Sequence, residues 1–197
     1  ETHADEPAFW LFSSGSTGNP KGTVHTQGNL YWTAQLYGKG VLALTSNDVV
    51  FSAAKLFFAY GLGNALTFPF SVGATTVLMP GQPRPEAVLD TIEAYRPTVL
   101  FGLPTLYTAL ARSEGVTGRD LSCIRQSMSA AEILSAEIYA AWKKLVGHGP
   151  TEGLGSTEVL HVYLSNQLDD HRLGAAGARV PGYEIRLVTP DGSDAPS

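Results

Sequence analysis

Short apolar runs and helix-like runs alternate along most of this chain. The clearest apolar run is Thr98–Gly102 (TVLFG), which is rich in strand-forming residues. The preceding run, Pro85–Tyr95, carries apolar residues at i, i+4 and i+7, a spacing typical of one buried helical face. Pro97 ends that helix and Pro104 suits the first turn of the next. Near-continuous apolar strands that alternate with helices predict an α/β fold, with a mainly parallel sheet flanked by helices.

The same patterns predict the remaining elements. Further strands are expected at Ala8–Phe12, Asp48–Ser52, Ala74–Met79, Cys123–Ser127 and Tyr183–Val188. Further helices are expected at Asn29–Tyr37, Gly61–Phe70 and Ser135–Leu145, the last with a serine cap. Ala8–Phe12 is apolar throughout, so we expect a buried strand, whereas Tyr183–Val188 alternates and suggests a strand with one exposed face.

Composition excludes several classes of protein. The 197 residues are 44% hydrophobic and 16% charged, a balance typical of globular proteins. The net charge of -5 and the lack of a basic cluster argue against nucleic-acid binding. Cys123 is the single cysteine, which excludes an internal disulfide and a cysteine-based zinc site and favours a reducing, cytoplasmic location. No apolar run approaches the ~20 residues that span a bilayer, and no signal peptide is recognisable.

A glycine- and serine-rich stretch, Ser13–Gly22 (SSGSTGNPKG), follows the first apolar run. It therefore lies at the carboxyl end of a predicted strand, where α/β proteins bind ligands. Glycines let backbone N–H groups converge on an anion, hydroxyls add donors, and Lys21 adds a mobile positive charge. The stretch does not fit the common G-x-x-x-x-G-K-[ST] motif, because Pro20 stands at the position of its second glycine, and with Pro20 before it Lys21 should not begin a helix. Composition alone leaves two interpretations open, a flexible surface turn or a phosphate-binding loop.

The complete string resembles the phosphate-binding loop of adenylate-forming enzymes. This superfamily contains acyl- and aryl-CoA ligases, luciferases and peptide-synthetase adenylation domains, whose loop reads S-G-[ST]-T-G-x-P-K-G after a strand. The resemblance implies that the loop holds the β- and γ-phosphates of ATP and that Lys21 assists catalysis. The loop residues implied in ATP binding are Ser13, Ser14, Gly15, Ser16, Thr17, Gly18 and Lys21.

Two further segments resemble the same superfamily in the expected order. Glu152–Glu158 (EGLGSTE) resembles its G-x-G-x-T-E element, in which the threonine contacts the α-phosphate region and the glutamate binds magnesium. Thr157 and Glu158 take these roles by resemblance, and a carboxylate suits a hard cation. Taken alone, Glu158 would be read as an ordinary surface acid. The residues of this element implied in ATP binding are Glu152, Gly153, Gly155, Ser156 and Thr157.

Ser127–Leu134 (SMSAAEIL) resembles the turn that contacts adenine in this superfamily. Ala130, Ala131 and Glu132 fall on that turn, and Ala131 stands where many members have glycine. Its methyl group is expected to narrow the adenine slot or to force a different backbone angle. Gly177–Val188 (GARVPGYEIRLV) resembles a later strand region and is expected to be scaffold.

Lys55–Pro69 (KLFFAYGLGNALTFP), together with Gly155–His161 (GSTEVLH), resembles the benzoate-CoA ligase branch in particular. The resemblance places four residues at the acyl pocket: Phe58, Ala59, Tyr60 and Gly61. Phe and Tyr can stack on an aryl ring, Leu154 can supply an apolar wall, and His161 can lie near the carboxylate or ring. Core packing for Tyr60, a satisfied buried histidine for His161, and a medium-chain acid as substrate remain open.

The resemblance implies ATP-dependent activation of an aromatic carboxylic acid to an acyl-adenylate, followed by transfer to coenzyme A, with Mg²⁺ as cofactor. Two alternatives remain, an adenylation domain that loads a carrier protein and a non-catalytic nucleotide-binding module. Residues 1–197 are expected to be a piece of the large domain, without an earlier N-terminal subdomain and without the C-terminal domain that carries a catalytic lysine. A homodimer is one arrangement that the parent protein allows.

Overall fold

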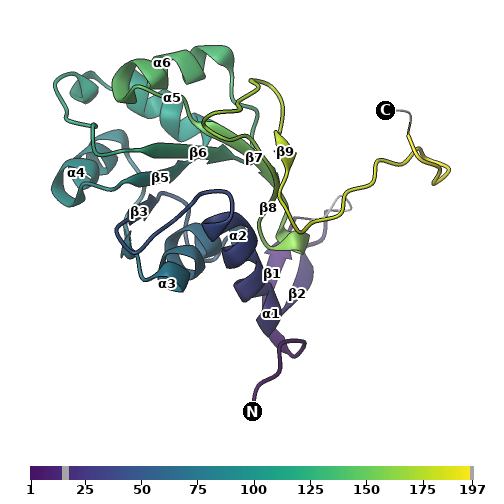
Figure 1. Cartoon of the computed structure of the whole chain (residues 1–197). Helices are drawn as coiled ribbons and strands as arrows, with labels where there is room; N and C mark the ends of the chain where they lie inside the picture. Colours follow the sequence, from purple (N-terminus) through teal and green to yellow (C-terminus); the bar gives the residue numbers. More distant parts are fainter. Residues whose placement is uncertain (15–17, 196–197) are drawn as a thin grey trace.

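A computed structural model describes residues 1–14 and 18–195 (Figure 1). Its main sheet has seven strands in the order β4-β3-β5-β6-β7-β8-β9. The five strands from β4 to β7 are parallel, and β8 and β9 are added antiparallel. The strands are β3 (Val49–Ser52), β4 (Thr75–Val77), β5 (Val99–Gly102), β6 (Gln126–Ala130), β7 (Thr151–Gly155), β8 (Val162–Ser165) and β9 (Ala178–Arg179). The predicted α/β fold with a mainly parallel sheet is confirmed.

Helices cover both faces of this sheet, as Figure 1 shows for α6 and α5 on one side and α3 on the other. Successive strand residues point to opposite faces, so Leu100 joins one core while Val99 and Phe101 join the other. This explains why the strands read as continuous apolar runs. The helices are α1 (Gln27–Thr33), α2 (Ala59–Leu62), α3 (Phe68–Val72), α4 (Pro85–Tyr95), α5 (Pro104–Arg112) and α6 (Ala136–Val146). Two π-helices, η1 (Ala34–Lys39) and η2 (Gly63–Thr67), and two 3₁₀ turns, η3 (Glu114–Val116) and η4 (Thr157–Val159), complete the helical elements.

Most predicted helices are confirmed with small shifts at their ends. The expected helix at 29–37 is α1 continued by η1, and the glycine-interrupted helix at 61–70 is α2, η2 and α3 in succession. The predicted cap of α6 is present, because the Ser135 hydroxyl accepts a hydrogen bond from the Ile138 N–H at 3.3 Å.

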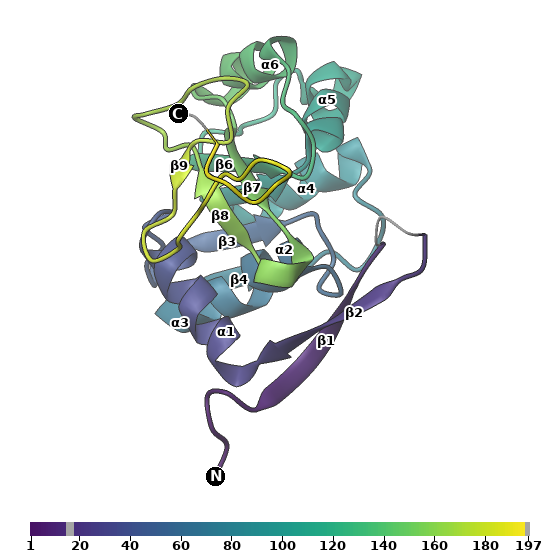
Figure 2. The same cartoon turned by 90° about the vertical axis from the view of Figure 1, so that its right-hand side faces the viewer.

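The N-terminal strand corrects the first expectation. β1 (Pro7–Ser13) pairs antiparallel with β2 (Lys21–Thr26) in a separate two-stranded sheet, which Figure 2 shows apart from the main sheet. Trp10 and Phe12 are 60% and 73% exposed, whereas Leu11 is buried, so β1 is not the buried strand that its composition suggested. A strand of a two-stranded hairpin packs on one face only, and an apolar run alone does not show whether one or both faces of a strand are buried. Lys21 begins β2 rather than a helix, as predicted.

Two other strand expectations also change. Tyr183–Val188 forms no strand, because within residues 1–14 and 18–195 its single pairing is the Val188–Asp194 bridge. Figure 1 shows this segment extending away from the sheet. The strand expected at 123–127 begins later, at Gln126, because the residues before it form a turn. The glycine-containing strand β7 and the short strands β8 and β9 were not predicted.

A buried carboxylate joins three segments beneath the amino ends of the strands. Asp48 accepts hydrogen bonds from Arg125 Nε and Nη2 at 2.8 and 3.0 Å, from the Thr98 hydroxyl at 2.7 Å and from the Thr45 N–H at 2.9 Å. Burial works to raise the pKa of Asp48, but these hydrogen bonds outweigh it and hold the pKa at about 2. This cluster fastens β3 to the segments that precede β5 and β6.

Over the ranges that the structure describes, no helix is long and apolar enough to cross a membrane.

Candidate active site

A cavity of about 320 Å³ lies at the carboxyl ends of β5, β6 and β7. This is the position where parallel α/β sheets bind ligands. Segments that are far apart in the sequence meet here. The lining residues are Ala54, Phe58, Ala59, Tyr60, Leu103, Ala130, Ala131, Gly155, Ser156, Thr157, Leu160, His161 and Val162.

Nine of the thirteen lining residues belong to the set predicted from the sequence, from Phe58, Ala59 and Tyr60 on one segment to His161 on another. The other four are Ala54, Leu103, Leu160 and Val162. Leu103 follows β5 directly, so the rule that sites follow strand ends would have found it. The other three are ordinary apolar residues that carry no distinguishing signal.

His161 forms an aromatic wall of the cavity. Its ring centroid lies 5.3 Å from that of Tyr37, 5.5 Å from that of Tyr60 and 4.5 Å from that of Phe68. Burial lowers the pKa of His161 to about 3, so the imidazole is neutral at physiological pH. Its Nε2 lies 3.3 Å from the Tyr60 carbonyl oxygen, which fixes Nε2 as the hydrogen-bond donor. The wall is therefore uncharged.

The backbone is unusual at two lining residues. Ala131 and Leu160 have φ values of 72° and 71°, in the left-handed region that non-glycine residues rarely adopt. Position 131 thus keeps a backbone angle of the kind that glycine favours, so the methyl group of Ala131 has not forced a different angle. Such strain persists where surrounding contacts hold the residue, and it is concentrated at functional sites.

The hairpin meets the β7–β8 turn beside the cavity. The Ser13 hydroxyl donates to Glu158 Oε1 at 2.9 Å, and His25 Nε2 lies 2.8 Å from the Thr157 carbonyl oxygen. In the β1–β2 register, Ser13 pairs with Lys21, so the two ends of the loop lie side by side, and the Ser13 end contacts Glu158. Gly18 has a φ of 84°, which requires glycine, while Gly15, Ser16 and Thr17 lie outside the described residues.

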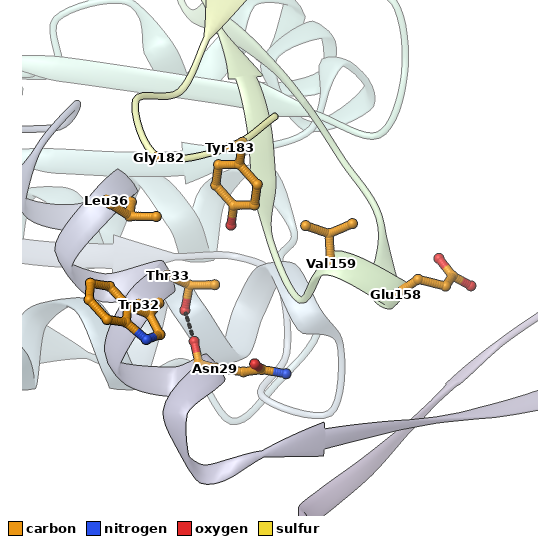
Figure 3. Close-up of a pocket in the computed structure, with 8 residues that line it drawn as sticks. All are labelled: Asn29, Trp32, Thr33, Leu36, Glu158, Val159, Gly182 and Tyr183. Carbon is orange, nitrogen blue, oxygen red and sulfur yellow. Dashed lines mark hydrogen bonds between the residues drawn. The ribbon is translucent and has the colours of Figure 1, made fainter. Parts of the chain in front are cut away.

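The carboxylate of Glu158 is suited to a cation. A hydrogen bond from its own backbone N–H, followed by that from Ser13, lowers its pKa, so the group is ionised near neutral pH. Figure 3 shows Glu158 at the edge of a second cavity of about 540 Å³, with its carboxylate directed away from Trp32 and Tyr183. Among the residues with described positions, no three His, Cys, Asp or Glu side chains form a metal cluster.

Several predicted site residues lie near the cavity without lining it. Gly61 packs against backbone, since an added Cβ would lie 2.1 Å from the Lys55 carbonyl oxygen. Glu132 is exposed, as is Leu154, at 44%, and Gly153 pairs with Ala130 in the sheet. Ser14 and Lys21 are on the loop side, and Glu152 is buried against backbone amides. Direct ligand contacts for these residues stay predictions.

The site and the fold agree with a family match. All 197 residues match the family model described as AMP-binding enzyme. The chain belongs to the AMP-binding enzyme family.

Within this family, the relatives include aryl-CoA ligases. The chain is 46% identical over 193 residues to a benzoate–CoA ligase of Thauera aromatica, covering 98% of the chain and 37% of that protein. Crystal structures of a benzoate CoA ligase from Burkholderia xenovorans LB400 match with a TM-score of 0.92 and 49% identity, covering 99% of this chain and 39% of that one. The anthranilate CoA ligase AuaEII, crystallised with anthranoyl-AMP, matches with a TM-score of 0.95 and 41% identity, covering 99% and 38%. The chain thus spans well under half the length of these relatives.

Proposed function

We propose that a full-length protein carrying this chain activates an aromatic carboxylic acid of the benzoate class with ATP and transfers the acyl group to coenzyme A. The observation that carries this proposal is the aromatic-walled cavity, which lies between the predicted adenine turn at Ala131 and the predicted phosphate contact at Thr157. The ligase names of the aryl-CoA relatives support the same class of reaction.

The cavity suits a compact aryl ring. Tyr60 and the neutral His161 line it with their rings stacked on each other, and Phe58, also in the lining, has 57% of its surface exposed. Aromatic side chains bind a second ring in offset or edge geometry. A cavity of about 320 Å³ is at the small end of ligand sites, which favours a single ring over a long acyl chain.

The other end of the cavity suits the triphosphate. Lys21 supplies positive charge at the loop, Thr157 supplies donors next to the cavity, and Ser13 and Glu158 join the loop to the β7–β8 turn. Magnesium held at Glu158 would neutralise phosphate charge in the transition state. Ser14, the glycines of the loop and the Ala130–Glu132 turn are proposed to complete the ATP contacts.

The chemistry then needs positioning rather than a protein nucleophile. A carboxylate oxygen of the acid attacks the α-phosphorus of ATP, the bond to the bridging oxygen breaks, and pyrophosphate leaves. The thiol of coenzyme A attacks the acyl carbon of the adenylate, loses its proton and releases AMP. Holding the two reactants in line and neutralising the phosphates accounts for catalysis of the first step.

Pyrophosphate exchange on the full-length protein tests this proposal. We expect ATP–pyrophosphate exchange with benzoate or a substituted benzoate and none with a fatty acid. Lys21→Ala should raise the KM for ATP by about tenfold or more, because one charged contact to phosphate is lost. Lys39→Ala, an exposed lysine at the end of η1, is the matched control.

Each alternative predicts a different result. Exchange with hexanoate but not benzoate would overturn the aryl assignment, and no exchange with any acid would favour the non-catalytic module. Transfer of the acyl group to a carrier protein in place of coenzyme A would identify a carrier-loading domain. A cytoplasmic location and a homodimeric parent protein stay predictions.

A further inference from the structure

The carboxylate of Glu152 is buried and bound on both oxygens by backbone amides. Leu134 N–H donates to Oε1 at 3.0 Å and Gly174 N–H donates to Oε2 at 3.4 Å. Glu152 is 7% exposed, and its backbone carbonyl also accepts from the Asn166 N–H at 2.8 Å. Charged groups are buried at a cost unless they are paired or hydrogen-bonded, so these contacts explain how the carboxylate is accommodated.

This carboxylate lies beside the strained turn of the cavity. Glu152 pairs with Ser129 in the sheet, and the chain then leaves β6 through Ala131, whose φ is 72°. Leu134, the first amide that Glu152 binds, lies at the far end of that turn. A left-handed alanine is maintained only if the residues on both sides are held. The sheet holds one side, and Glu152 holds the other.

A second contact ties the same carboxylate to α6. His171 Nε2 lies 3.9 Å from Glu152 Oε2, and the His171 ring stacks on Tyr139 of α6 with centroids 4.8 Å apart and planes at 6°. The segment that carries His171 and Gly174 is thereby packed between α6 and the end of β7. Glu152 lies where the turn, this segment and α6 meet.

We infer that Glu152 is a positioning residue that sets the backbone of the Ala131–Leu134 turn for the adenine ring. This inference rests on the proposed function, because it takes this turn as the adenine contact. Glu152 acts through the amides of Leu134 and Gly174 rather than by touching the nucleotide. Held in this conformation, Ala131 lines the cavity.

The first test compares Glu152→Gln with the unchanged full-length protein. Glutamine keeps the shape but has one oxygen, so one of the two amides faces an NH₂ group and loses its acceptor. We expect AMP affinity to fall by roughly tenfold, because a hydrogen bond to a charged group is lost, while pyrophosphate affinity stays within about twofold. Glu137 is an exposed residue of α6, so Glu137→Gln is the matched control and should change neither affinity.

Hydrogen exchange on the same variant gives a readout that does not depend on the reaction. The amides of Leu134 and Gly174 should exchange faster in Glu152→Gln, while those of β5 stay protected. Unchanged exchange at both amides would contradict the view that the Glu152 carboxylate holds them. Faster exchange with unchanged AMP affinity would overturn its role in positioning. If the unchanged protein bound no AMP, the proposed function would fail, and the role of Glu152 toward adenine would fail with it. The exchange result would still show whether Glu152 holds the amides of Leu134 and Gly174.

A milder variant covers the case in which Glu152→Gln does not fold. Gly174→Ala adds a methyl group where nothing lies within 4 Å, but at a φ of 77°, so it strains one contact without removing the charge. We expect AMP affinity to fall about two- to fivefold. Gly192→Ala, with a φ of 85° and equally open surroundings, is the control. Equal effects of the two alanines on AMP affinity would contradict the inference.

Discussion

At the scale of single residues, Asp48 shows how one carboxylate can hold several segments. Asp48 is 4% exposed and accepts hydrogen bonds from Arg125, Thr98 and the Thr45 amide. These hydrogen bonds replace those to water that the carboxylate loses on burial. Removing its charge leaves Arg125 without a charged partner, and an asparagine here keeps one of the two acceptor oxygens and replaces the other with an NH₂ group.

We expect Asp48→Asn to lower the free energy of unfolding by about 2 kcal/mol at pH 7. The folded pKa of about 2 is below the ordinary 3.8, so the stabilisation is complete above about pH 4 and is lost as the pH falls through 2. Urea unfolding at pH 7 and at pH 3 measures this difference. Asp169→Asn, at an exposed position, is the control. If the loss of unfolding free energy in Asp48→Asn were as large at pH 3 as at pH 7, the prediction would be contradicted.

At the scale of elements, the π-helix η2 brings a glycine against the aromatic wall. A Cβ added at Gly63 would lie 2.4 Å from His161 Cδ2 and 2.8 Å from Phe68 Cζ. Both rings are buried, so neither can move away without cost. The helix backbone therefore sets the depth of the cavity at this point.

Gly63→Ala should accordingly push His161 toward the cavity. We expect a loss of about 1–3 kcal/mol in the free energy of unfolding and a higher KM for the aryl acid, with the KM for ATP unchanged. Thermal unfolding and pyrophosphate exchange on the full-length protein measure the two effects. Gly81→Ala, with open space around it, should change neither, and a selective rise in the KM for ATP would contradict the mechanism.

Elements could be predicted where burial gives a clear apolar pattern, on both faces of a strand or on one face of a helix. Thr98–Gly102 and Pro85–Tyr95 agree with β5 and α4 because each is packed into a core. β2 (KGTVHT) and β7 (TEGLG) contain glycine and polar residues, so their pairing is decided by neighbours rather than by their own composition.

The candidate site was predicted better than the strands around it. Motif resemblance identified Phe58–Tyr60, Ala130–Ala131 and Gly155–Thr157 together with His161, and all of these line one cavity. Leu160 and Val162 could not be found, because apolar residues at a cavity and in a core look alike. The packing of Glu152 against amides also has no sequence signature.

At the scale of the whole molecule, the chain spans 37% of the length of the benzoate–CoA ligase of Thauera aromatica. Lys21 and Glu158 lie on the phosphate side, whereas the second lysine is implied to lie in a C-terminal domain. We therefore expect the 197-residue chain alone to form aryl-adenylate several orders of magnitude more slowly than the full-length protein. Single-turnover formation of benzoyl-AMP by both proteins measures this, and equal rates would refute the prediction.

The residues that line the cavity run in sequence from Ala54 to Val162, which is more than half of the chain. During synthesis, the β3–β5 part of the sheet has its residues available long before the His161 wall has left the ribosome. A ligand for this site therefore has nothing to bind while the first strands assemble. Substrate can slow unfolding of the finished protein, but it cannot guide the early steps of its folding.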